Sequence, residues 1–226
     1  MMSVSKSTRR RVAIFGSSLN PPTGLCGHQS VVDHFAKLFD QVMVLPVYAH
    51  VFDSKRNSLE PFEHRVAMAR LCFAPLIEAG EDVVVSTVER DLTKKLGVEQ
   101  RLGTYQVLTY LRSLPENADT DFVLILGTDT FNDLCSGKWR NGPELLSTTE
   151  IAIIHREGYP MVQIDPSLNI KAMIYEMGAT SEGVSSTGAR DACAAGDEAT
   201  MAKYLPLSVI EYIKEHKLYN FGIGAP

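Results

Sequence analysis

The stretch VAIFGSSLNPPTGLCGHQSVVDHFAKLF, residues 12–39, carries a strand pattern, a loop and a helix pattern in direct succession. Four apolar residues lead to Gly16, and small, polar and proline residues follow it. A helical stripe of apolar residues then begins three residues after His28. A buried strand that passes through such a loop into a helix is typical of α/β proteins, so this stretch indicates the class of the fold.

Four more apolar, β-branched segments follow along the chain. They are short and do not alternate strictly, which is typical of strands buried on both faces. The predicted strands are residues 11–16, 41–47, 82–87, 121–127 and 150–155. Four helices are predicted. The first carries the apolar stripe Val31, Val32, Phe35, Leu38 and Phe39, and the second carries Phe62, Val66, Ala69 and Phe73. The third and fourth cover residues 104–114 and 207–218. This alternation predicts an α/β fold of three layers, with a doubly wound parallel sheet of the Rossmann-like type.

Composition places the chain among ordinary folded proteins. It has 226 residues, of which 45% are hydrophobic and 22% charged, and we find no repeat or linker, so we expect one domain over residues 1–226. Residues 1–10 are basic but lack an apolar segment, which favours a flexible arm over a targeting peptide. The net charge of −5 argues against nucleic acid as a partner, and no stretch is long enough to span a membrane.

The four cysteines are far apart and form no Cys-x-x-Cys pair. We therefore expect reduced thiols in a cytoplasmic protein, and no metal site built from protein side chains alone. The sequence leaves the oligomeric state open, and a homo-oligomer is compatible with it.

The loop after the first strand has the features of an anion site. Ligands of doubly wound sheets bind beyond the carboxyl ends of the strands. Gly16, Ser17 and Ser18 let the backbone approach a ligand, and the helix that opens near His28 points free N–H groups at the same place. A protonated His28 would add positive charge there. The alternative is ordinary turn residues followed by a capping histidine.

A second anion site is predicted by EGVSSTGARDACAAG, residues 182–196. It places Ser185, Ser186 and Thr187 just ahead of a predicted helix, with Arg190 about one helical turn further on. Hydroxyl groups, free N–H groups and a guanidinium on one helix end suit a phosphate. The alternative is a Ser/Thr helix cap with a solvated arginine.

A third segment, LILGTDTFNDLCSGKWRNGPELL, covers residues 124–146. Gly127 ends a buried strand, and Asp129 lies where a carboxylate can accept hydrogen bonds from ribose hydroxyls. The single tryptophan, Trp139, follows in a loop and could stack on a flat heteroaromatic ring. Its alternative role is packing or anchoring an interface.

Together these segments resemble the nicotinate/nicotinamide mononucleotide adenylyltransferases of the nucleotidyltransferase superfamily. The family's opening motif is roughly Gly-Gly/Ser-x-Phe-Asp/Asn-Pro-x-His/Thr-x-x-His, and residues 16–23 and His28 match it. Its closing motif, Ile-Ser-Ser-Thr-x-x-Arg, is matched by residues 184–190. Further matches are Gly127 and Asp129 followed by Trp139, a Glu-His-Arg helix at Glu63, His64 and Arg65, and a helix start at Thr104 and Tyr105.

The resemblance implies a reaction and a role for each matching residue. The phosphate of a pyridine mononucleotide, nicotinate or nicotinamide mononucleotide, would attack ATP with Mg²⁺ bound and release pyrophosphate in NAD biosynthesis. In this reading the catalytic residues are His28, Thr23 and Arg190; ATP is bound by Gly16, Ser17, Ser18, His28, Gly127, Asp129, Ser186, Thr187 and Arg190; and the mononucleotide is bound by Lys55, Thr104 and Trp139. His64 and Arg65 would be supports of the site or helix-surface residues, and for His64 the surface is favoured.

The chain departs from the family pattern at two points. Leu19 replaces the usual Phe, and the gap from Thr23 to His28 is two residues longer than usual. The longer loop could bring His28 onto the phosphates or displace it. Two other functions therefore stay open: a sibling transferase acting on another phosphate-bearing acceptor such as phosphopantetheine, and a nucleotide-binding sensor without turnover. The spacing through Trp139 resembles bacterial members and favours nicotinate.

Overall fold

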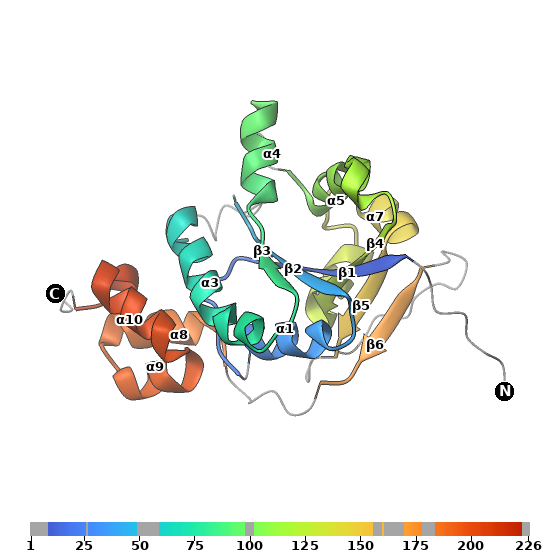
Figure 1. Ribbon diagram of the computed structural model, residues 1–226. Coiled ribbons are helices and arrows are strands. Elements are labelled where there is room, and N and C mark those ends of the chain that lie inside the picture. Colours follow the sequence, from blue (N-terminus) through green and yellow to red (C-terminus); the bar gives the residue numbers. More distant parts are fainter. Residues whose placement is uncertain are drawn as a thin grey trace.

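Six parallel strands form one sheet with the order β3-β2-β1-β4-β5-β6. The computed structural model describes residues 9–25, 27–48, 59–97, 102–155, 160, 170–177 and 184–222. The strands are β1 (Arg10–Ser17), β2 (Gln41–Pro46), β3 (Val83–Val85), β4 (Thr120–Gly127), β5 (Glu150–Ile154) and β6 (Ala172–Tyr175). The chain builds outward from β1 to β3 and then returns to place β4 on the other side of β1 (Figure 1). The strand order therefore reverses between β1 and β4.

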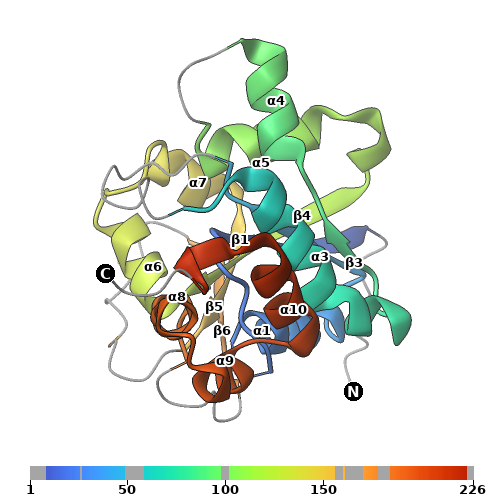
Figure 2. The same ribbon diagram turned by 90° about the vertical axis from the view of Figure 1, so that its left-hand side faces the viewer.

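Helices cover both faces of the sheet, which makes three layers. They are α1 (His28–Ala36), α3 (Phe62–Glu78), α4 (Val88–Leu96), α5 (Thr104–Ser113), α6 (Thr128–Cys135), α7 (Gly142–Thr148), α8 (Ser186–Ala195), α9 (Glu198–Tyr204) and α10 (Leu207–His216), with short 3₁₀ turns η1 (Pro115–Asn117) and η3 (Leu218–Asn220). One buried cluster joins the sheet to α1, α3 and α8 to α10, and a second joins it to α5, α6 and α7. Figure 2 shows α8, α9 and α10 gathered beside α3.

The central strands are apolar on both sides because each side packs against a different cluster. In β1, Ala13 belongs to the first cluster, whereas Val12 and Ile14 belong to the second. In β4, Val123 and Leu124 divide in the same way. Successive side chains of a strand point to opposite faces, so a strand covered on both faces shows an unbroken apolar run. The predicted α/β class with a parallel, doubly wound sheet is confirmed.

Some expected boundaries were wrong. Leu38 does not belong to the stripe of α1, because that helix ends at Ala36 and Leu38 is half exposed. The last long helix ends at His216 rather than at residue 218, because Lys217 has a positive φ of 51°. Strand β6 and the helices α4, α6, α7 and α9 were not expected from the sequence.

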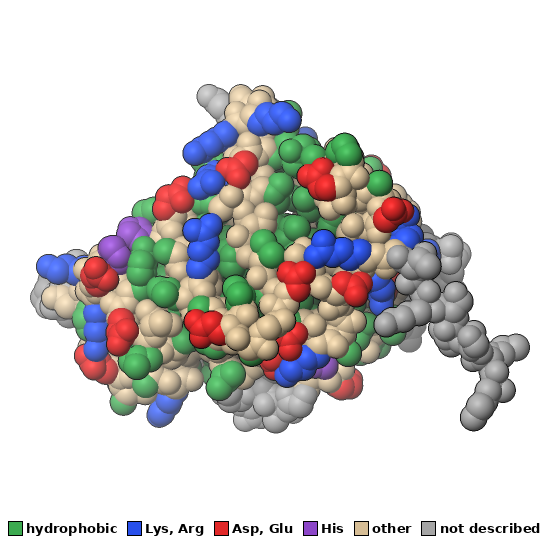
Figure 3. Space-filling model, viewed as in Figure 1, with side chains coloured by type: hydrophobic (Ala, Val, Ile, Leu, Met, Phe, Trp, Pro, Cys, Tyr) green, Lys and Arg blue, Asp and Glu red, His purple; other side chains and the backbone are tan. Residues whose placement is uncertain are grey.

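On the face seen in Figure 3, acidic and basic side chains are interspersed, with hydrophobic side chains between them. No helix in the described part of the chain is long and apolar enough to cross a membrane.

Candidate active site

The predicted site residues gather at the carboxyl ends of β1 and β4, where the strand order reverses. Gly16 is exposed at the end of β1, and a Cβ there would meet no atom within 4 Å. Two helices begin at this edge: α6 at Thr128, directly after β4, and α1 at His28. The positive dipole ends of both helices make this edge of the sheet suited to an anion.

Thr23 and His28 form a closely bonded pair. The Thr23 backbone N–H donates to His28 Nδ1 (3.0 Å), and the Thr23 hydroxyl lies 2.8 Å from the same nitrogen. In return, the His28 backbone N–H donates to Thr23 Oγ1 (3.0 Å). A backbone N–H can only donate, so Nδ1 carries no proton and the ring proton lies on Nε2, 3.0 Å from Ser17 Oγ. The charged imidazolium that the sequence suggested does not fit, because it would set two N–H groups against each other.

The His28 ring lies beside the end of β1 despite the longer loop, with Nε2 3.0 Å from Ser17 Oγ. Within that loop the Gly27 N–H donates to the Gly24 carbonyl (2.9 Å). The Gln29 N–H then returns to the Thr23 carbonyl (3.1 Å). A Cβ on Gly27 would clash with the Thr23 hydroxyl, so glycine is required where the turn meets the helix. The Leu25 side chain is 77% exposed, whereas Thr23 is 2% exposed.

This pairing predicts the effect of removing the Thr23 hydroxyl. We expect Thr23→Val to lower the free energy of unfolding by about 1–3 kcal/mol, because it leaves the His28 N–H at the start of α1 without its acceptor. Urea denaturation measures the difference. Thr93→Val is the matched control, because its hydroxyl donates to the Glu89 carbonyl within α4 (2.7 Å). Equal destabilisation by the two variants would contradict the expectation.

The second predicted anion site lies against the first. Arg190 Nη1 donates to the Asn20 carbonyl (2.9 Å), and the Ser186 hydroxyl donates to the Pro21 carbonyl (2.8 Å). Arg190 Nη2 also reaches the Thr187 hydroxyl (3.1 Å). The two segments that the sequence suggested separately are therefore one unit in space.

The helix of this second segment begins earlier than expected. All three hydroxyls were expected ahead of it, but α8 begins at Ser186. Ser185 is the cap, with its hydroxyl accepting from the Gly188 N–H (3.0 Å). Ser186 and Thr187 consequently lie in the first helical turn, where backbone N–H groups are free to bind a ligand.

Arg65 is a support of the loop rather than a helix-surface residue. It is 1% exposed, and its guanidinium donates to the carbonyls of Ser18 (2.8 Å), Glu60 (2.9 Å) and Tyr48 (3.4 Å). Burial lowers the pKa of Arg65 below its usual value. The sequence signal was an arginine inside the apolar stripe of α3, between Phe62 and Val66. The connection after β1 and both ends of the connection between β2 and α3 are thus joined through one side chain.

His64, the neighbour of Arg65, faces away from this loop. It is half-buried, and its Nδ1 lies 3.0 Å from the Tyr212 hydroxyl. The prediction that His64 is a helix-surface residue is therefore only partly right. The ring is partly exposed, but it also bonds α3 to α10.

Two of the residues expected to hold the mononucleotide, Thr104 and Trp139, belong to the face of the sheet that α5, α6 and α7 cover. The helices α1 and α8 cover the other face. Thr104 is the first residue of α5, and half-buried Trp139 lies in the turn between α6 and α7. The two are near each other, because a Cβ on Gly103 would lie 3.9 Å from the Arg140 carbonyl oxygen. Part of the indole packs against the second apolar cluster, so packing accounts for some of its contacts. Lys55 lies outside the described residues.

Gly127 and Asp129 lie where β4 ends and α6 begins. Gly127 caps α6, and Asp129 lies in the first turn of that helix, half-buried. The Thr128 hydroxyl between them donates to the Ile154 carbonyl (3.0 Å) and fixes the helix start to β5. The Asp129 carboxylate therefore stands at the carboxyl end of β4, where the sequence placed it.

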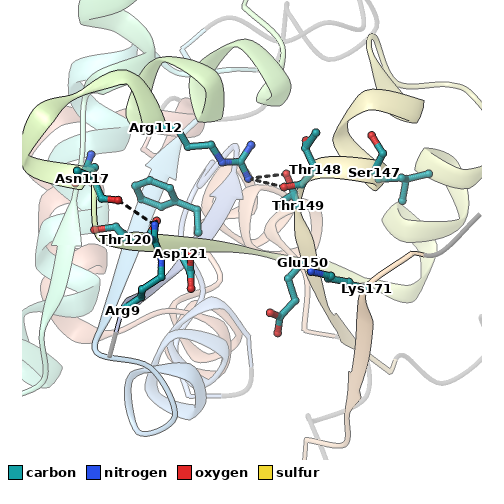
Figure 4. Close-up of a pocket in the computed structure, with 13 residues that line it drawn as sticks. Arg9, Arg112, Asn117, Thr120, Asp121, Ser147, Thr148, Thr149, Glu150 and Lys171 are labelled. Atoms are coloured by element: carbon teal, nitrogen blue, oxygen red, sulfur yellow. Dashed lines mark hydrogen bonds and ion pairs between the residues drawn. The ribbon is translucent and has the colours of Figure 1, made fainter. Parts of the chain in front are cut away.

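A cavity of about 430 Å³ opens at the opposite edge of the sheet (Figure 4). Its lining includes Thr120 and Glu150, the first residues of β4 and β5. The Glu150 carboxylate is paired with Arg11 (2.6 Å), and Arg112 donates to the Thr149 hydroxyl (2.9 Å). The cavity thus lies at the amino ends of the strands and shares no residue with the loop after β1.

Comparison with known proteins gives the family. The model of the cytidylyltransferase-like family matches residues 14–192, from β1 through most of α8. The chain belongs to the cytidylyltransferase-like family. Both halves of the candidate site of this cytidylyltransferase-like protein, the loop after β1 and the start of α8, fall inside the match.

Similar proteins cover nearly the whole chain. A probable nicotinate-nucleotide adenylyltransferase of Myxococcus xanthus is 29% identical over 93% of this chain and 95% of its own length. One of Streptococcus pneumoniae is 26% identical over 96% and 92%. The structure of Plasmodium falciparum nicotinic acid mononucleotide adenylyltransferase complexed with NaAD has a TM-score of 0.75, with 24% identity over 95% of this chain and 99% of that chain. It shares the fold of this cytidylyltransferase-like protein.

Proposed function

We propose that this protein is a nicotinate-nucleotide adenylyltransferase, which transfers AMP from ATP to nicotinate mononucleotide and releases pyrophosphate. The observation that carries the proposal is the joining of two motif segments, residues 16–28 and 184–190, through the Arg190–Asn20 and Ser186–Pro21 bonds. The curated relatives named nicotinate-nucleotide adenylyltransferase support it, because they align over almost their full length.

The chemistry needs positioned donors rather than a covalent enzyme intermediate. The phosphate oxygen of the mononucleotide forms a bond to the α-phosphorus of ATP, and the bond from that phosphorus to the oxygen bridging it to the β-phosphorus breaks. Negative charge grows on the phosphoryl oxygens, and the Nε2–H of His28, which donates to Ser17 Oγ (3.0 Å) in this structure, would donate to them instead. The start of α8 and Arg190 would hold the pyrophosphate that leaves.

Magnesium enters this reaction with ATP. Among the described residues there is no group of three or more His, Cys, Asp or Glu side chains that could hold a metal ion. Mg²⁺ is commonly held by phosphate oxygens, water and one or two carboxylates, so the triphosphate supplies most of its ligands. The Asp129 carboxylate, in the first turn of α6, is proposed to accept hydrogen bonds from the ribose hydroxyls of ATP.

Trp139 is proposed to stack on the pyridine ring. We expect Trp139→Leu to raise the KM for nicotinate mononucleotide about three- to tenfold, because an aromatic contact contributes about 0.5–1.5 kcal/mol beyond its buried area. The KM for ATP should stay unchanged. Trp139→Phe keeps an aromatic face and serves as the comparison, with most of the affinity retained. Equal KM values for the Leu variant and the wild type would assign Trp139 to packing alone.

The proposed function is tested by pyrophosphate release. ATP and Mg²⁺ are supplied with nicotinate mononucleotide, nicotinamide mononucleotide or phosphopantetheine in separate reactions. Release that is fastest with nicotinate mononucleotide supports the proposal, whereas release with phosphopantetheine alone identifies a sibling transferase. ATP binding without release from any acceptor would identify the sensor.

We also place the proposed enzyme in the cytoplasm. Cys72, Cys135 and Cys193 are free thiols. Burial raises the pKa of Cys72 to about 12 and that of Cys193 to about 11, so both thiols stay protonated and poorly reactive at neutral pH. Such buried free cysteines are usual in a reducing compartment.

A further inference from the structure

The loop after β1 is held through its carbonyl groups by side chains from distant parts of the chain. Arg65 holds the Ser18 carbonyl, Arg190 holds the Asn20 carbonyl, and Ser186 holds the Pro21 carbonyl. These bonds fix the backbone of residues 18–21 immediately before Thr23 and its pairing with His28. The conformation of the loop therefore depends on tertiary contacts more than on its own sequence.

The Asn20 side chain is a further and deeper point of attachment. Asn20 is 3% exposed, and its Oδ1 accepts from the Glu60 backbone N–H (3.0 Å) and from the Tyr219 hydroxyl (3.0 Å). The Glu60 carboxylate in turn accepts from the Tyr219 backbone N–H (2.9 Å). Asn20, Glu60 and Tyr219 thus form a closed hydrogen-bonded group beneath the loop, and Tyr219 is 199 residues away from Asn20 in sequence.

An unusual backbone conformation after α10 places the Tyr219 side chain beneath the loop. Lys217, Tyr219 and Asn220 all have positive φ angles, of 51°, 55° and 59°. Non-glycine residues rarely adopt this region, and such strain persists only where the surrounding contacts support it. The bend turns Leu218 and Tyr219 inward, where they are 6% and 7% exposed and join the first apolar cluster.

The Tyr219 hydroxyl is a constant donor. Burial and then the Glu60 carboxylate raise the pKa of Tyr219 well above its usual value, against the weaker effect of Arg65 and Arg190. The hydroxyl consequently stays protonated at every pH at which the protein would work. A buried donor of this kind is costly to leave without its acceptor, so it holds Asn20 in one position.

We propose that Tyr219 is a positioning residue of the candidate active site, which holds residues 18–23 so that His28 and the start of α8 face the ATP phosphates. The proposal rests on the proposed function for its catalytic consequence, but not for its structural one. Tyr219 touches no reacting atom; it acts through Asn20 and the loop.

Tyr219→Phe tests this role in the full-length protein, because it removes the hydroxyl and keeps the buried ring. Tyr212→Phe is the matched control: it removes a hydroxyl that bonds His64 on α3, away from the loop. We expect Tyr219→Phe to lower kcat roughly tenfold, about the worth of one buried hydrogen bond, while Tyr212→Phe leaves kcat unchanged. Assays run well below both melting temperatures separate this effect from unfolding.

Amide hydrogen exchange supplies a second readout that needs no turnover. In Tyr219→Phe the Leu19 and Thr23 amides should exchange about tenfold faster, while the amides of β4 keep the rates they have in Tyr212→Phe. Glu60→Ala, which removes the acceptor of the Tyr219 N–H, should shift the same amides in the same direction and is the second variant if Tyr219→Phe folds poorly.

The outcomes separate the two proposals. Faster exchange of the loop amides together with lower kcat supports the positioning role. Unchanged loop exchange, or a kcat that falls no further than in Tyr212→Phe, overturns it. If the wild-type protein releases no pyrophosphate with any acceptor, the proposed function fails, and the exchange rates alone then decide whether Tyr219 holds the loop.

Discussion

His28→Ala is expected to lower kcat by about 10²- to 10³-fold while the protein stays folded. The Nε2–H of His28 points at the loop after β1, and removing one preorganised donor to a developing charge typically costs this much. His28 is half-buried at the start of α1, and its ring adds little to the apolar core. Steady-state pyrophosphate release gives kcat, and urea denaturation gives the free energy of unfolding.

The same helix offers the control for this prediction. His34 lies near the end of α1, and its ring packs against Phe35 and Tyr175. His34→Gln removes an imidazole from α1 without touching the loop, so it should keep kcat within about twofold of the wild type. A His28→Ala enzyme with the kcat of His34→Gln would remove His28 from the mechanism.

The central strands could be predicted from the sequence because helices cover both of their faces. Residues of β1 and β4 pack alternately into two apolar clusters, and this leaves an unbroken apolar run that few other structures produce. The edge strand β6 has four residues, and two of them, Met173 and Ile174, are half exposed. The missed helix α4 buries only Leu92. A short or exposed element leaves too few constrained positions for a pattern to show.

The arrangement of the proposed anion site was predictable for a different reason. Gly16 and His28 lie beside the strand and helix that place them, so local order alone brings them together. Tyr219 binds the side chain of a residue far away in sequence, and no local pattern marks it. Arg65 is marked by its place in the apolar stripe of α3, but the carbonyl groups that it binds are not. The site of the ring proton of His28 could not be predicted either, because it follows from the Thr23 N–H, which lies against Nδ1 only in the folded loop.

Arg190→Met is the second large effect we expect. The guanidinium lies between the Asn20 carbonyl and the Thr187 hydroxyl at the start of α8, where the phosphates of ATP are proposed to bind. Loss of two charge-assisted hydrogen bonds to phosphate should raise the KM for ATP and lower kcat/KM by about 10²-fold or more. Arg190→Lys keeps the charge but lacks the planar guanidinium, so its kcat/KM should lie between those of the wild type and Arg190→Met. Kinetics at varied ATP concentration measure the change.

Two comparison variants decide what the guanidinium does. Arg70→Met removes an exposed arginine of α3 and should leave the KM for ATP unchanged, which controls for net charge. Tyr219→Phe removes the bond to the Asn20 side chain, so it loosens the same loop without removing a cation. If Arg190→Met raises the KM for ATP no more than Tyr219→Phe does, Arg190 only holds the loop. A KM that rises at least tenfold further assigns the guanidinium to the phosphates, because charge-assisted bonds contribute roughly twice as much as neutral ones.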